Sequence, residues 1–209
     1  DPAALGTSYL VAEPSFGPED LASALERNWW PLLGQSRTRI AVYDYDGEEV
    51  PLAPQDRDEL RPFLQALALA TDTVDLRERG DSVAPLTVAG IEVGVLALTS
   101  DDSENGWSYE DPDYNRTLVA LVRNDMVIAY EPFPRKQRQK GPYLRGTLLV
   151  DRAENSPASE LLRMSEPHLH NEWQTNAGNA VPKESADFAA ATLNLVQKRV
   201  GELRSSLKE

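Results

Sequence analysis

The chain has 209 residues, of which 41% are apolar, enough for a sizeable core in one large domain or two small ones. Its 21 Lys and Arg residues against 34 Asp and Glu residues give a net charge of −13. That balance argues against a nucleic-acid-binding surface, because phosphate contacts need concentrated positive charge. The lack of cysteine excludes disulfides, thiolate metal ligands and cysteine nucleophiles.

Nothing in the sequence points to a membrane or to export. No apolar run reaches the ~18 residues that a membrane-spanning helix needs. The first five residues, Asp-Pro-Ala-Ala-Leu, contain no Met and lack the basic-then-apolar pattern of a signal peptide. We therefore expect position 1 to be a processing point or the start of a fragment. We expect no membrane association and a cytoplasmic location.

The first part of the sequence predicts two helices and several short strands. In chain order these are a strand over 5–13, a helix from Pro18 to Gly34, a strand pair over 37–52 with a turn at Asp46-Gly47, and a helix over 56–71 in which Pro62 makes a bend or a late start. In the first helix, Leu21, Leu25, Trp29 and Leu32 follow at spacings that give one apolar face. Trp30 would then lie about 100° away and could mark a partner surface.

The second part predicts strands followed by helices. We expect a loop over 72–84, a buried strand over 86–98 with a bulge or tight turn at its glycines, an exposed loop over 100–115, a hairpin of 117–122 and 126–130, a strand over 146–150, a helix over 159–164 and a last helix capped by Ser185. This order predicts an α+β fold with a mixed, largely antiparallel sheet and packed C-terminal helices. We expect residues 1–152 to form the sheet-containing domain and residues 153–209 a helical segment packed on it.

The stretch 165–173 holds both histidines of the chain, a Pro and a Trp. On a strand, His168 and His170 would point to the same face and could bind a metal, with Glu166 or Glu172 adding oxygen ligands. The same carboxylates could serve in acid–base catalysis. The alternative is a structural joint, in which Pro167 breaks a helix, His170 and Glu172 form hydrogen bonds, and Trp173 anchors the segment.

A basic segment, Arg135-Lys136-Gln137-Arg138-Gln139-Lys140, lies between two predicted strands. Its ordinary interpretation is a solvated connection. Its functional interpretation is a loop on which Lys140 or Lys136 contacts a phosphate as a point charge. The sequence contains no P-loop motif, no Gly-x-Gly-x-x-Gly and no Gly-x-Ser-x-Gly motif.

Several blocks of the sequence resemble bacterial GHKL (Bergerat-type) ATPase proteins, relatives of Hsp90, gyrase and MutL. The blocks are Gly6-Thr7-Ser8, residues 27–33 (RNWWPLL), 38–42 (TRIAV), 121–127 (LVRNDMV), 145–151 (RGTLLVD) and 161–173 (LLRMSEPHLHNEW). In the last and most specific block, Glu166-Pro167, His170 and Trp173 match the family and His168 does not.

The resemblance implies that the chain is the region after an ATP-binding domain. That region would be a transducer of ribosomal S5-like fold with C-terminal helices, and a transducer Lys, here Lys140 or Lys136, would contact the γ-phosphate. ATP and Mg would be cofactors of the parent protein, because the ATPase motifs are missing from these residues. The expected partners are the chain's own upstream ATPase domain and other protein chains, with a homodimer as one form.

Three functional hypotheses therefore stand. The first is a non-catalytic transducer or interaction region of a GHKL-type ATPase. The second is a metal-dependent hydrolase that uses His168, His170 and Glu172. The third is a stand-alone protein-interaction domain.

Overall fold

The computed structural model describes residues 15–34, 39–71, 81–101, 117–133, 143–151, 153, 156–167, 171–178 and 180–207. The predicted strand over 5–13 and most of the predicted loops over 72–84 and 100–115 lie outside these residues. The described elements are α1 (Pro18–Leu33), β1 (Val42–Tyr43), β2 (Glu49–Val50), a 3-10 helix η1 (Pro54–Asp56), α2 (Arg61–Ala70), β3 (Ser82–Val88), β4 (Ile91–Asp101), β5 (Thr117–Arg123), β6 (Met126–Phe133), β7 (Tyr143–Val150), α3 (Pro157–Ser165) and α4 (Lys183–Ser206).

Five of the strands form one mixed sheet in the order β3-β4-β7-β5-β6. Every neighbouring pair is antiparallel except β5 and β7, which run parallel with Ala120 opposite Thr147. The remaining two strands, β1 and β2, form a separate antiparallel hairpin. The α+β class and the largely antiparallel sheet are confirmed, and the finer S5-like arrangement stays a prediction.

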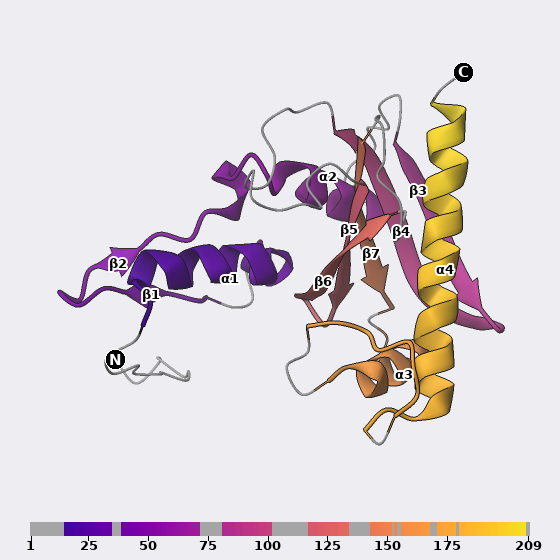
Figure 1. Cartoon of the computed structure of the whole chain (residues 1–209). Coiled ribbons are helices and arrows are strands. Elements are labelled where there is room, and N and C mark those ends of the chain that lie inside the picture. The colour runs from indigo at the N-terminus through magenta and orange to yellow at the C-terminus, as the bar shows by residue number, and fades with distance from the viewer. Residues whose placement is uncertain are drawn as a thin grey trace.

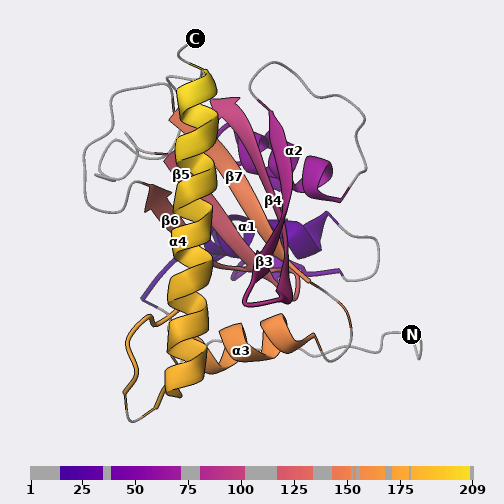
Figure 2. The ribbon, with the colours of Figure 1, turned by 90° about the vertical axis from the view of Figure 1, so that its right-hand side faces the viewer.

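Helices cover both faces of the five-stranded sheet (Figures 1 and 2). On one face α2 packs against β4 and β7, and α1 packs against β6. On the other face α4 runs along β3 and β4, and α3 packs beside α4. The larger apolar cluster joins the sheet to α3 and α4, whereas the smaller ones lie under α1 and α2. Strand β5 is buried along its whole length because both faces are covered.

The apolar run 86–98 forms the end of β3 and most of β4 rather than one strand. A tight turn at Ala89 and Gly90, both at positive φ, separates β3 from β4. The register shifts between Leu86 and Thr87, opposite Gly94, which has a φ of +143°. The sequence prediction of a bulge or tight turn is therefore confirmed twice over. The predicted loop over 72–84 is wrong at its end, because β3 begins at Ser82.

The turn between β5 and β6 is formed as the sequence predicts. Asn124 has a φ of +50° and Asp125 a φ of +63°, a conformation that these two side chains tolerate better than most. The last helix begins earlier than expected. Its N-cap is Pro182, and the predicted cap, Ser185, is buried inside the first turn.

The two tryptophans of α1 take the opposite places from those predicted. Trp30 is 0% exposed and Trp29 is 36% exposed. The indole nitrogen of Trp30 donates to the hydroxyl of Tyr130 on β6 at 2.8 Å. That hydroxyl in turn donates to the carbonyl oxygen of Arg27 at 2.5 Å. The carbonyl is open to it because Pro31, four residues on, has no N–H to donate.

The edge strands of the sheet are β3 and β6, and each contains a proline. Pro85 lies beside the register shift of β3, and Pro132 lies near the end of β6. Proline is accommodated in an edge strand where its missing N–H faces away from the neighbouring strand.

Candidate functional site

The stretch that begins at the end of α3 passes directly over the end of β5. Helix α3 stops at Ser165, whose hydroxyl donates to the carbonyl oxygen of Leu162 at 2.7 Å. Glu166 then adopts an extended backbone, with φ −81° and ψ 137°. A residue before proline is pushed out of the helical region, and Pro167 follows here. The chain therefore turns away from the helix at the point where Glu166 faces the sheet.

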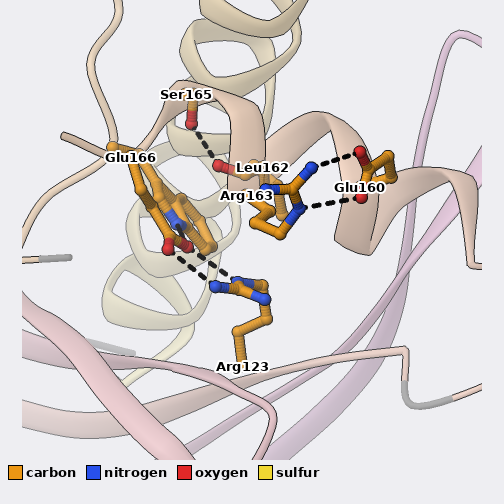
Figure 3. Close-up of polar contacts among 7 residues, drawn as sticks. Arg123, Glu160, Leu162, Arg163, Ser165 and Glu166 are labelled. Carbon is orange, nitrogen blue, oxygen red and sulfur yellow. Dashed lines mark hydrogen bonds and ion pairs between the residues drawn. The ribbon is translucent and has the colours of Figure 1, made fainter. Parts of the chain in front are cut away.

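Glu166 forms a buried two-point ion pair with Arg123, the last residue of β5. The two carboxylate oxygens of Glu166 accept from Nε and Nη2 of Arg123 at 2.7 and 2.6 Å. The side chain of Glu166 is 0% exposed and that of Arg123 is 7% exposed. Figure 3 shows the side of the Arg123 guanidinium that carries Nε and Nη2 facing the carboxylate of Glu166. This fork-to-carboxylate geometry is the strongest form that such a pair takes.

Trp173, seven residues after Glu166, is the third member of this group of contacts. Its indole nitrogen donates to Oε1 of Glu166 at 3.2 Å, and its ring belongs to the larger apolar core. The backbone N–H of Gln174 donates to the carbonyl oxygen of Ser165 at 2.9 Å. Arg123, Glu166 and Trp173, called here the buried joint, thus tie the strand end, the helix end and the path toward α4 together.

Helix α3 also carries an exposed ion pair, between Arg163 and Glu160, which differs from the buried pair in its access to water. Arg163 donates to the two oxygens of Glu160 at 2.9 and 2.6 Å, and both side chains are more than half exposed. The hydrogen bond from Arg163 lowers the pKa of Glu160, and the same bond raises the pKa of Arg163. Water screens this pair, whereas in the buried joint each charge depends on its partner for solvation.

The other residues singled out from the sequence fall in different places. Glu172 is exposed and forms no hydrogen bond or ion pair with any described residue, so the carboxylate that bridges the joint is Glu166. His168, His170, Lys136 and Lys140 lie outside the described residues. Within the described part of the chain, no group of three or more His, Cys, Asp or Glu side chains gathers in a way that could hold a metal ion.

Arg123 is the site residue that the sequence did not reveal. In the sequence it reads as the first residue of a turn, Arg123-Asn124-Asp125, and its partner lies 43 residues away. A lone arginine at a strand end carries no local signal of burial. The nearest available signal is that Arg123 ends an otherwise apolar run from Leu118 to Val122.

A second buried carboxylate fixes α1 to the segment before α2. Glu26, which is 2% exposed, accepts from the backbone N–H of Ala53 at 2.6 Å and from Nε of Arg57 at 2.7 Å. Ala53 is the residue before η1, and its backbone N–H has no partner within that short helix. Glu26, 27 residues earlier in the chain, accepts this hydrogen bond. This contact is structural, since Glu26 satisfies backbone and a half-exposed arginine.

Comparison with family models, with curated proteins and with solved structures finds no match to this chain. The GHKL family therefore stays a prediction from the quoted blocks. Among the described residues, no helix is both long enough and apolar enough to cross a membrane.

Proposed function

We propose that this chain is the non-catalytic transducer and interaction region of a larger GHKL-type ATPase. In this role it passes the nucleotide state of an upstream ATP-binding domain to partner proteins or to a second copy of the same protein. ATP and Mg belong to the upstream domain, and the parent protein works in the cytoplasm.

The observation that carries the proposal is the buried joint. A region that transmits a conformational state needs its parts to move as connected bodies rather than independently. Arg123, Glu166 and Trp173 supply such a connection, because they bind the end of a central strand to the segment leading into α4. A displacement of β5 would therefore reach the C-terminal helix through a charge pair that is costly to break.

The test of nucleotide sensing uses the longer natural protein. Steady-state ATP turnover is measured for wild type and for Lys140→Ala and Lys136→Ala. Loss of a lysine that contacts the γ-phosphate lowers turnover by roughly tenfold or more, the scale of one charge-assisted contact. Lys198→Ala, an exposed lysine on α4, is the matched control and leaves turnover unchanged.

Two outcomes overturn parts of the proposal separately. Unchanged turnover in both lysine variants removes phosphate sensing by this segment. A natural protein that neither binds nor hydrolyses ATP removes the ATPase link altogether. ATP-dependent dimerisation or partner binding that is lost in Glu166→Ala, at a temperature where that variant remains folded, supports transmission through the buried joint.

A further inference from the structure

The β1–β2 hairpin projects from the side of the molecule opposite α4 (Figure 1). It packs against α1 and belongs to neither face of the five-stranded sheet. Its inner residue, Val42, is buried, and the next residue along the strand, Tyr43, is 58% exposed. Since successive side chains of a strand point to opposite sides, the hairpin has an inner face on α1 and an outer face in solvent.

The outer side of the hairpin carries large aromatic rings. Tyr45, in the turn, is 77% exposed. The structure describes five exposed large hydrophobic residues, and four of them, Phe16, Trp29, Tyr43 and Tyr45, belong to α1, its N-terminal approach or the hairpin. Exposed tyrosine and tryptophan side chains are enriched at protein-binding surfaces.

The same hairpin is strongly acidic. Residues 39–50 contain four carboxylates, at positions 44, 46, 48 and 49, and one cation, Arg39, so their net charge is 1 − 4 = −3. Glu49 accepts from Arg39 at 2.6 Å, and Asp44 accepts from two backbone N–H groups of the turn. Asp46 and Glu48 form no ion pair with any described residue and are exposed. Asp46 directly follows the exposed Tyr45 in the turn, and Glu48 comes three residues after it.

We propose that the exposed turn end of this hairpin is a docking surface for a lysine- and arginine-rich segment of another protein. A guanidinium or ammonium group stacks on a tyrosine face and also pairs with a nearby carboxylate. The tyrosines and the carboxylates therefore both favour a partner rich in lysine and arginine. Phosphate-rich partners, such as nucleic acid, are repelled by the same charge. The proposal does not depend on the ATPase link, because it rests on the hairpin alone.

The experiment measures binding of a fluorescein-labelled peptide, an Arg-Gly-Lys-Ser repeat, to the full chain by fluorescence anisotropy. Two variants remove the two halves of the surface. Tyr43→Ala with Tyr45→Ala removes the rings, and Asp46→Lys with Glu48→Lys reverses the free charges. We expect each to weaken binding at least about fivefold, and we expect wild-type binding to weaken as salt is added.

The matched control reverses two exposed carboxylates on α4, Glu184→Lys with Asp187→Lys. It changes the net charge by the same amount as the hairpin charge variant and keeps wild-type affinity. Equal weakening in this control shows attraction to the whole acidic molecule and overturns the proposal. Absence of peptide binding to wild type, or tighter binding of an oligouridine RNA or of a second copy of the chain, also overturns it. Unfolding curves for each variant confirm that the fold is intact.

Discussion

Glu166 is the residue at which a strand end, a helix end and the path toward the last helix meet. Among the hydrogen bonds with described residues, its carboxylate accepts two from Arg123 and one from Trp173. A charge removed from water keeps a favourable energy only when its partners replace the lost hydration. The stability of the buried joint therefore depends on all of these hydrogen bonds being present together, rather than on any one of them.

Removing one member of the buried joint should cost more than removing both charges. Glu166→Ala leaves Arg123 buried without its partner, which we expect to lower the free energy of unfolding by about 3–5 kcal/mol. The double variant Arg123→Met with Glu166→Leu should be clearly more stable than Glu166→Ala, because apolar side chains need no counter-ion. Urea unfolding measures both.

The control for this prediction is Glu160→Ala, which breaks the exposed pair with Arg163. Its unfolding midpoint should stay close to that of wild type because water solvates both charges. A Glu166→Ala variant as stable as Glu160→Ala would contradict a buried, mutually dependent pair.

Tyr130 is the second residue with a distinct measurable behaviour. Burial raises the pKa of its hydroxyl above the ordinary value of 10.0, because the charged phenolate would lose its hydration. The raised pKa means that the folded state favours the neutral form. This contribution to stability is present below pH 10 and is lost as the pH rises above it.

Absorbance at 295 nm across an alkaline titration should therefore show a late phase, at a pH above 10, from the ionisation of Tyr130. Tyr130→Phe should remove that late phase and destabilise the fold by about 1–3 kcal/mol, since the indole N–H of Trp30 loses its acceptor. Tyr45→Phe, at an exposed position, should keep both the late phase and wild-type stability. A late phase that survives in Tyr130→Phe would rule out this assignment.

At the scale of elements, the β3–β4 hairpin shows how closely two strands are fitted to a third. A Cβ atom on Gly94 would lie 2.0 Å from the carbonyl oxygen of Leu149 and 2.9 Å from the backbone nitrogen of Asp151. Gly94 also has a φ of +143°, which other residues rarely adopt. Glycine is required there for both reasons.

Two glycine substitutions in this hairpin separate crowding from backbone strain. Gly90→Ala places a Cβ in open space at a φ of +81°, so we expect a cost of about 1–2 kcal/mol from strain alone. Gly94→Ala adds a backbone collision between β4 and β7 and should lower the thermal midpoint several times further. Similar midpoints for the two variants would show that β4 and β7 separate easily.

Local signals predicted elements well where the deciding chemistry lies within a few residues. The Asn124-Asp125 turn and the end of α3 before Pro167 are of this kind. The inner face of α1 is not, because apolar residues surround much of the helix. Trp30 is buried instead of Trp29 because it packs in an apolar cluster with side chains of α2, β5 and β6, and its indole N–H finds an acceptor 100 residues away, on Tyr130. No spacing rule within the helix contains that information.

At the scale of the whole molecule, the sequence predicted the fold class but not the order of the strands. Strand β7 lies between β4 and β5, although β6 is the strand that precedes it in the chain. No local sequence pattern indicates this pairing. The candidate site shows the same limit. Glu166, Pro167 and Trp173 stand out as a motif, whereas Arg123 reaches them only once the sheet is assembled.

The prolines in the two edge strands determine how far the sheet can grow. Pro85 and Pro132 each remove a backbone donor, and the pairing of β3 also shifts register between Leu86 and Thr87. An added strand from a neighbouring molecule would meet an interrupted ladder at either edge. The two edges of this sheet should therefore resist joining to strands of neighbouring molecules even at high protein concentration.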